Sequence, residues 1–545
     1  MKSHYLTRIA LSMLTISSLS AAQLAFSASV PAGTELAERQ ELVRNNGSEP
    51  ASLDPHKVES DVEFNIISDL FDGLIAVKQD GSIEPRLAQT WENKDNTVWI
   101  FHLRPNITWS DGTAITAKDF VWSWQRLVDP KTASPYASYP GNMHIENARE
   151  IALGNKSVET LGVKALNDST LEIRLTQPTA AFLPMLAHPS MVPVDKILIN
   201  RFADKWTRPE HIVTSGAYKL SNWVVNEKIV AQRNLRYWDN GATVINKVTY
   251  LPISSEAADV NRYKAGEIDI TYGVPVNQYA QLKASLGSEV SVLPLLSTYY
   301  YELNNTRAPF NDARVRRALN MALDKDIIAQ KVMGQGQRPA WLISQPEIGG
   351  VTLNTPEYAS WPREKRIAEA KKLLNEAGYN EAHPLSFTLL YNTMETHQRL
   401  AIAVSSMWKK NVGVEAKLQN QEWKTMLDTM HTGNFDAVRY AWIADYDDAA
   451  TFLNNFRTGD SENTSKYSNP DYDKVLHNAA RAKDTALRGR YYQQAEDILA
   501  QDVPAIPLYH YVRAHLVKPW VGGFEPDRLG HYYTKDMYIK KHEGL

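Results

Sequence analysis

The strongest constraint on the fold is a stretch of chain in which strand and helix patterns alternate over five consecutive elements. Apolar side chains at every second position are typical of strands, and apolar side chains three or four positions apart are typical of helices. The order is strand, helix, strand, helix, strand over residues 385–391, 396–411, 414–418, 422–430 and 435–442. Such an alternation forms a βαβαβ unit with parallel strands. We therefore expect an α/β protein that contains a doubly wound parallel unit.

Parallel sheets bind their ligands beyond the carboxyl ends of the strands. Residues 392–397 and 444–448 follow two of the expected strands, and the second stretch carries three acids. We expect Asp447 and Asp448 to cap the helix that follows, because acids are stabilised at a helix N-terminus. Asp445 suits such capping and the pairing with a ligand ammonium equally well.

Arg439 lies inside the expected strand 435–442. A charge in a buried strand is costly unless it is paired or faces a cleft. A guanidinium group matches the two oxygens of a carboxylate. Arg439 is therefore a candidate carboxylate binder.

The remaining chain mixes strand and helix patterns, and we expect sheets with mixed strand directions. The clearest elements are a strand over 97–104, a turn over 109–112, a helix over 117–127, a helix capped by Asn311 or Asp312, and a helix over 363–377 ended by Gly378. No internal repeat, low-complexity tract or Gly/Ser linker separates independent domains. The lobes of the protein must therefore be joined by strands that cross between them, and such connections make hinges.

The N-terminus has the pattern of a secretory signal peptide. Lys2 and Arg8 precede an apolar run that is interrupted by serines and carries no acid, and it is shorter than the about 20 apolar residues of a membrane span. Ala25 and Ser27 occupy the small-residue positions of a cleavage site. We expect residues 1–27 to be removed, a mature chain that starts at Ala28, and export to the periplasm.

Amino-acid composition further limits the kind of protein and the partners that this chain can have. The chain has no cysteine, so it has no lipid-attachment cysteine and no disulfide. Loss of residues 1–27 removes two basic residues and no acid, which changes the formal net charge from -3 to -5. That charge favours neither nucleic acid nor an anionic membrane surface. About 518 mature residues are enough for two to four lobes.

No motif for catalysis or cofactor binding is present. The chain lacks the nucleophile-elbow, Walker, zinc-protease, C-x-x-C and dinucleotide fingerprints. His510 and His515 are close in sequence, but a metal site there is disfavoured. We therefore expect no cofactor, no metal and no enzymatic activity.

Several motifs stand in the order of a known family. They are LDPHK at 53–57, WSDGT at 109–113, FVWSWQR at 120–126, NRYKAGEID at 261–269, TYYYE at 298–302, WKKN at 408–411, NQEWKT at 420–425 and KPWVGG at 518–523. Through them the chain resembles the periplasmic oligopeptide-binding proteins of bacterial ABC importers, in solute-binding protein family 5. The resemblance covers essentially the whole mature chain.

The resemblance implies a three-lobed periplasmic binding protein of the type II, or Venus-flytrap, class. We expect lobe I over 28–71, 196–296 and 513–545, lobe II over 72–195, and lobe III over 297–512. Two lobes would close over an extended peptide, which is held by main-chain hydrogen bonds in a cleft with roomy side-chain pockets. The implied partners are short peptides and a membrane-embedded ABC peptide permease, and the implied state is a monomer.

The resemblance also implies roles for individual residues. Asp445 would bind the ammonium of the peptide, with main chain around residues 441–444, including Ala441, Trp442 and Ala444, and around 58–61, including Asp61, beside the ligand. His397 and Arg439 would bind the carboxylate of a shorter or middle-length peptide. The side-chain pockets or the far end would be lined by Glu59, Tyr136, His188, Tyr300, Glu302, Asn392, His397 and Trp423.

The chain departs from the oligopeptide pattern in three places. Met430 and Met333 replace an arginine and a lysine that bind peptide carboxylates in the pattern, and Ser297 and Ile443 replace a cysteine pair. The loss of two cations opens the question of peptide length. The replacement methionines are equally compatible with neutral drift in a water-filled pocket and with a wider, more tolerant one.

Three other functions would use the same fold or groove. A murein tripeptide receptor is favoured by residues 338–341 and 419–421 and by the absence of cysteine, whereas Glu59, His188 and Met430 favour general oligopeptides. A hydrolase would need a nucleophile and a base in contact. A chaperone-like or sensory role would use the same groove and leaves no separate mark in the sequence.

Overall fold

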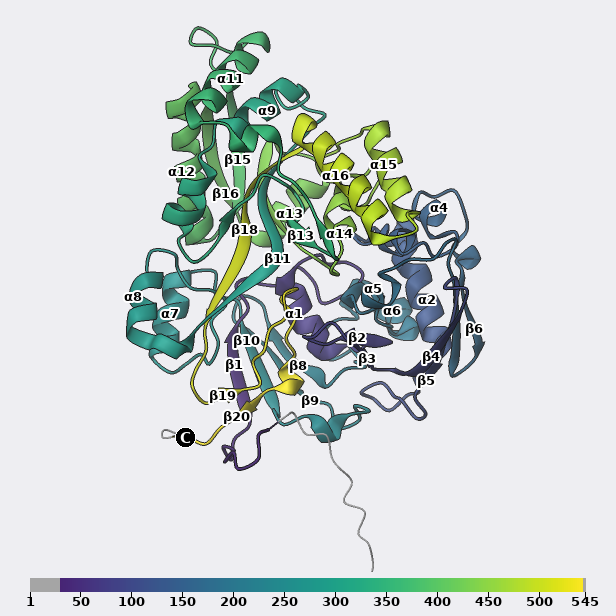
Figure 1. The fold of residues 1–545 in the computed structure, drawn as a ribbon. Helices are drawn as coiled ribbons and strands as arrows, with labels where there is room; N and C mark the ends of the chain where they lie inside the picture. Colours follow the sequence, from purple (N-terminus) through teal and green to yellow (C-terminus); the bar gives the residue numbers. More distant parts are fainter. Residues whose placement is uncertain (1–29, 543–545) are drawn as a thin grey trace, which may run out of the picture.

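The computed structural model describes residues 30–542, so the expected signal peptide and its cleavage site lie outside the described residues. Within them, three larger sheets of four, six and four strands organise the chain (Figure 1). The mixed α/β class expected from the sequence is confirmed. No helix among residues 30–542 is long and apolar enough to cross a membrane.

The six-stranded sheet contains the βαβαβ unit. Its strand order is β12-β18-β11-β17-β15-β16, with bounds Arg338–Pro339, Ala505–Leu516, Val290–Leu303, Ala437–Ile443, Ser386–Asn392 and Glu415–Gln421. Strand β15 pairs in parallel with both β16 and β17. Helices α12 (Glu395–Val412) and α13 (Trp423–His431) make the two crossovers. The expected unit is confirmed, and each of its strands begins within two residues of the predicted position.

Strands β11 and β18 run side by side from the upper to the lower half of the molecule in Figure 1. Their antiparallel pairing is interrupted between Pro294 and Thr298 and resumes beyond. The interruption falls beside the expected lobe boundaries at 296/297 and 512/513. An irregularity of this kind disrupts the ladder and bends the strand locally.

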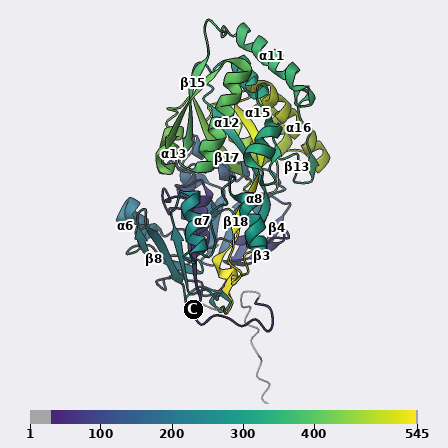
Figure 2. The same ribbon diagram turned by 90° about the vertical axis from the view of Figure 1, so that its left-hand side faces the viewer.

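A second sheet has the order β1-β10-β9-β8, with bounds Glu41–Asn45, Lys247–Leu251, Lys228–Arg233 and Tyr218–Val224. Helices α7 (Glu256–Lys264) and α8 (Tyr279–Leu286) lie between this sheet and α12 in Figure 2. The third sheet has the order β4-β5-β7-β6, with bounds Ala88–Lys94, Val98–Leu103, Thr170–Arg174 and Val163–Asn167. Strands distant in sequence join two of these sheets, because β1 pairs with β10 and β18 pairs with β11.

The small elements complete the fold. Two-stranded pairs are β2 (Ile75–Val77) with β3 (Ile83–Pro85), β13 (Glu347–Ile348) with β14 (Val351–Thr352), and β19 (Val521–Gly522) with β20 (Tyr538–Ile539). The other α-helices are α1 (Asp61–Leu70), α2 (Ala117–Val128), α3 (Tyr139–Asn142), α4 (Ala148–Ala152), α5 (Phe182–Leu186), α6 (Lys196–Phe202), α9 (Ala313–Met321), α10 (Lys325–Ile327), α11 (Arg363–Glu376), α14 (Ala450–Leu453), α15 (Pro470–Ala480) and α16 (Thr485–Asp502).

Local sequence signals set several helix ends. Asp312 caps α9 by accepting the backbone N–H of Arg314, as expected. Gly378 adopts φ of +91° just past α11, a conformation that ends helices and suits glycine. Asp448 accepts the N–H of Ala450 at 3.0 Å just before α14, although the N-cap of that helix is Ala449. Asp447 instead accepts the N–H of Gly349 at 2.9 Å.

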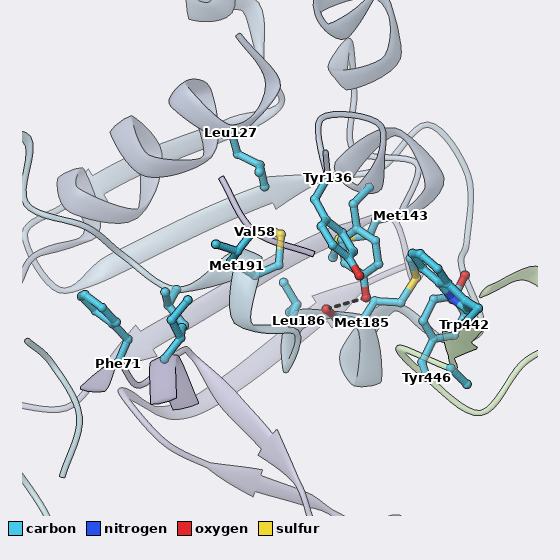
Figure 3. Packing of buried hydrophobic residues seen from close by; sticks show 14 of the residues in the cluster. Val58, Phe71, Leu127, Tyr136, Met143, Met185, Leu186, Met191, Trp442 and Tyr446 are labelled. Atoms are coloured by element: carbon cyan, nitrogen blue, oxygen red, sulfur yellow. Dashed lines mark hydrogen bonds between the residues drawn. The ribbon is translucent and has the colours of Figure 1, made fainter. Parts of the chain in front are cut away.

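The largest apolar cluster joins parts that lie far apart in sequence. Figure 3 shows Tyr136 and Met185 facing Trp442 and Tyr446. Trp442 lies on β17 of the six-stranded sheet, and Tyr446 lies three residues after the end of that strand. The rings of Tyr136 and Trp442 are 6.3 Å apart between centroids, and Tyr139 meets Tyr446 edge to face at 6.4 Å. The described chain is therefore in an arrangement in which residues 72–195 touch residues 297–512.

Candidate ligand-binding site

One cavity lies between the six-stranded sheet, helix α1 and the loops around residues 136, 188, 272–276 and 529–533, and most of the predicted site residues line it. Twelve of the fourteen predicted residues line it: Glu59, Asp61, Tyr136, His188, Asn392, His397, Trp423, Arg439, Ala441, Trp442, Ala444 and Asp445. They come from the start of α1 and the residues before it, from Tyr136 and His188, from the end of β15, from the starts of α12 and α13, and from β17 and the two residues after it. Both stretches expected beyond the carboxyl ends of the parallel strands contribute to its wall.

The backbone and the carboxylate of Asp445 are both held by uncharged groups. Its backbone N–H donates to Oγ1 of Thr451 at 3.0 Å, and the hydroxyl of Tyr136 donates to Oδ1 at 3.1 Å. Nε2 of His188 lies 3.4 Å from the same oxygen. The Asp445 side chain is only 9% exposed, so its carboxylate has lost most of its water.

The tautomer of His188 follows from the hydrogen bond at its other ring nitrogen, Nδ1. The backbone N–H of Ser190 donates to Nδ1 at 3.2 Å, so Nδ1 is an acceptor and the ring hydrogen sits on Nε2, toward Asp445. A neutral imidazole therefore orients Asp445 without cancelling its charge. A buried carboxylate served only by neutral donors is suited to a cation from the ligand.

His531 is the nearest titratable group of the C-terminal loop. Burial lowers its pKa, but the carboxylate of Asp527, with Oδ2 3.3 Å from Nδ1, raises it above the usual value. Asp445 contributes to that rise. The charge of His531 is thus already matched by Asp527.

Arg439 provides a cation at the other end of β17. Its side chain is buried, its Nη1 donates to Oδ1 of Asn392 at 3.2 Å, and its guanidinium lies 4.8 Å from the ring centroid of Tyr299. Within residues 30–542 no carboxylate lies at ion-pair distance from it. Burial, together with the charge of Arg439, holds the pKa of the adjacent His397 well below its usual value. The site thus has a buried guanidinium with room for a carboxylate and a neutral imidazole beside it.

The edge of β17 between these two residues is open. On one side β11 pairs with it from Ala437 to Ile443, but on the other side β15 reaches only Ala437 and Val438. The N–H of Ala444 donates to Leu296 on the β11 side. By the two-residue period of a strand, the main-chain groups of Arg439, Ala441 and Ile443 face the cavity instead. An extended chain can therefore pair with this edge.

Two acids on the opposite wall already have partners. Asp61 receives Nη2 of Arg513 at 2.7 Å and the hydroxyl of Tyr272 at 3.0 Å. Glu59 lies 2.9 Å from Nε2 of His431. Burial lowers the pKa of His431, but the Glu59 carboxylate raises it above its ordinary value.

Two predicted residues lie off the cavity. Tyr300 packs against Tyr440 and Phe456, and Glu302 accepts a hydrogen bond from the hydroxyl of Thr464. The segment 456–464 covers that face of β11. Met430 is also buried away from the cavity, whereas Met333, Ser297 and Ile443 line it. Ser297 and Ile443 are register partners on β11 and β17, as a cross-strand pair requires.

The sequence did not indicate several lining segments. They are residues 64–65, 272–276, 335–337, 511–514 and 529–533. Residues 64–65 lie on α1 and the other segments lie on loops or on β18, where neither periodicity nor a motif marks a binding role. Only Met333, next to residues 335–337, was singled out from the sequence, because it replaces a lysine of the family pattern.

A nucleophile and base are in contact, but not at the cavity surface. Oγ of Ser190 lies 2.8 Å from Nδ1 of His188, whose Nε2 faces Asp445. Ser190 is fully buried, does not line the cavity, and binds the same nitrogen through its own N–H. Residues 30–542 contain no group of three or more metal-binding side chains.

The chain matches a model of the bacterial extracellular solute-binding proteins, family 5 (middle region), over residues 82–464. It is 54% identical over 529 residues to the periplasmic oligopeptide-binding protein OppA of Salmonella typhimurium, covering 97% of both chains. A solved complex of Haemophilus influenzae OppA with RPPGFSPFR is 44% identical, with a TM-score of 0.91 over 93% of this chain and all of that one.

Two solved forms of the Escherichia coli murein tripeptide binding protein MppA have the same sequence identity to this chain but differ in structural similarity to it. Both are 45% identical to this chain. One has a TM-score of 0.91 over 93% of this chain and 100% of its own, and the unliganded open form has 0.64 over 94% and 99%. Because the identity is the same, the difference reflects how the parts are placed. The described chain is therefore not in the arrangement of that open form.

Proposed function

Because the chain belongs to the bacterial extracellular solute-binding proteins of family 5, we propose that it captures short peptides in the cavity and delivers them to a membrane-embedded ABC peptide importer. The observation that carries the proposal is the open edge of β17, with the Asp445 carboxylate at one end and the Arg439 guanidinium at the other. A zwitterionic extended peptide matches this pattern of charge and hydrogen bonding.

The bound peptide runs antiparallel to β17. Its ammonium pairs with Asp445, its main chain bonds to Ala441 and Ile443, and its carboxylate meets Arg439 beside Asn392 and His397. Glu59, Asp61, Tyr136, His188 and Trp423, with Trp442 and Ala444, form the surrounding wall. Tyr300 and Glu302 lie off this site and pack against Tyr440, Phe456 and Thr464.

Peptide length is limited by the distance between the two charges. Asp445 lies six positions after Arg439 and two after the end of β17, which corresponds to about 20 Å at the usual rise of a strand. An extended peptide of up to about six residues fits that span, and the long arginine side chain reaches back toward shorter ones.

Closure is proposed to occur between three lobes, 28–71 with 196–296 and 513–545, then 72–195, and 297–512. Each of the first two contains one four-stranded sheet, and the third contains most of the six-stranded sheet. The ladder break in β11 and β18 supports a hinge between the first and third.

General oligopeptides are favoured over murein tripeptide as the ligand. The identity to the Salmonella typhimurium oligopeptide receptor is 54%, against 45% for the murein tripeptide binding protein. Main-chain recognition along β17 also sets few demands on side chains. Native mass spectrometry of the freshly purified protein should find a mixture of co-purified peptides, and a single murein tripeptide would select the alternative.

We further propose that the protein is not an enzyme and works in the periplasm as a monomer without a lipid anchor. The burial of Ser190 supports the first point, because a nucleophile must reach its substrate. Peptides recovered after prolonged incubation should be intact. Mass determination of the exported chain should place its first residue at Ala28.

A further inference from the structure

A second, outward-facing groove lies directly behind the Arg439 end of the cavity. It is lined by Glu256, Val276, Asn277, Glu395, Thr396, Gln398, Arg399 and Ile402. Three of these residues, Glu256, Val276 and Thr396, also line the cavity. The wall between cavity and groove is therefore one layer of side chains thick.

That wall joins two helix N-termini from different expected lobes. Oε2 of Glu256, at the start of α7, accepts the N–H of Thr396 at 2.8 Å, and Oε1 accepts its hydroxyl at 2.9 Å. Glu395, at the start of α12, accepts the hydroxyl of Ser255 at 2.7 Å and the N–H of Glu256 at 2.9 Å. Each helix thus receives its cap from the other.

A wall made between two lobes separates when the lobes open. A peptide that binds to the open form can lie across the line of the wall before closure, and it need not be threaded through. All four hydrogen bonds end on carboxylate oxygens, so main-chain N–H groups of a passing peptide can replace the donors of Ser255, Glu256 and Thr396. The wall is thus suited to act as a gate.

The groove beyond the gate has the chemistry of a peptide terminus. Arg399 is exposed and has no carboxylate at ion-pair distance within residues 30–542. Gln398 and Asn277 offer amide groups, and Ile402 is 54% exposed and apolar. A carboxylate, a main chain and one apolar side chain would match these three features in turn.

We propose that peptides longer than about six residues leave the cavity between Glu256 and Thr396 and lay their C-terminal residues in this groove, with the terminal carboxylate on Arg399. The inference rests on the proposed function, since the same peptide has its ammonium on Asp445. It extends the range of ligands beyond the span of β17. The relative from Haemophilus influenzae shows that this fold can hold the nine-residue peptide RPPGFSPFR.

The test compares a tetrapeptide with RPPGFSPFR by isothermal titration. Arg399→Glu should weaken binding of the nine-residue peptide about threefold to tenfold, in the range of an exposed ion pair whose charge is reversed, and change tetrapeptide binding less than about twofold. Arg399→Lys should retain most of the affinity. A C-terminal amide on the longer peptide should abolish its sensitivity to Arg399→Glu.

Lys410→Glu is the matched control, because Lys410 is an exposed cation on the same helix, away from the groove. Equal losses in both variants would overturn the proposal, as would unchanged binding of the longer peptide in Arg399→Glu. Failure of the parent to bind the longer peptide while it binds the tetrapeptide would also overturn it. Failure to bind the tetrapeptide would refute the proposed function itself.

Discussion

The hydroxyl of Tyr136 donates to Oδ1 of Asp445 at 3.1 Å, across the contact between residues 72–195 and 297–512. This bond uses the same carboxylate that faces the ligand cavity. Ligand binding and the approach of the two parts therefore share one side chain, and a ligand that pairs with Asp445 stabilises the arrangement in which Tyr136 reaches it.

Two serines hold the same contact without touching the cavity. The N–H of Ser138 donates to Oγ of Ser461 at 3.1 Å, and the N–H of Ser461 donates to Oγ of Ser138 at 2.9 Å. Ser138→Ala with Ser461→Ala should destabilise the closed form by about 1–2 kcal/mol and speed peptide release. Stopped-flow dissociation rates measure this, with Ser406→Ala as the control. An unchanged rate of peptide release would show that this contact does not stabilise the closed form.

Arg439 is predicted to act on the peptide carboxylate. Arg439→Gln should weaken binding of a free-acid tetrapeptide by about 1.5–3 kcal/mol, the range for hydrogen bonds to charged groups, because glutamine keeps polarity without charge. The corresponding peptide amide should lose much less affinity. Titration calorimetry with both ligands tests the pairing, and equal losses would assign Arg439 a structural role.

Glu302 makes stability depend on pH. Burial raises its pKa to about 7, and the nearby Glu59 adds to the rise while the Thr464 hydroxyl opposes it. The folded state therefore holds a proton that the unfolded chain loses above about 4.5, so the cost appears as pH rises through 4.5 and is complete above 7. Glu302→Gln should raise stability by up to about 3 kcal/mol at pH 8 and change little at pH 4.

Denaturant unfolding at the two pH values checks this dependence. Glu381→Gln, an exposed substitution of the same kind, is the control. A gain that is the same at pH 4 and pH 8 would show that burial of the Glu302 charge is not its source.

The sequence predicted those parts of the fold in which local pattern and packing agree. The βαβαβ unit was predictable because β15, β16 and β17 alternate with helices of regular period, and Asp445 and Arg439 could be singled out by their positions on that unit. Tyr300 and Glu302 could not be placed, since segment 456–464 packs over their face of β11 through contacts distant in sequence. The loop around His531 and the gate at Glu256 and Thr396 also depend on such contacts.

Peptide capture is proposed to depend on the pairing of Asp445 with the peptide ammonium, and Asp445→Asn removes that charge while it keeps the shape of the side chain. Titration calorimetry would compare a free tetrapeptide with its N-acetylated form, with Asp447→Asn as a control from the same loop. We predict that Asp445→Asn costs the free peptide about 3 kcal/mol or more, roughly a hundredfold in affinity, and leaves the weaker acetylated ligand nearly unchanged. Parental affinity for the free peptide in Asp445→Asn, or an equal loss for both ligands, would show that Asp445 does not bind the peptide ammonium.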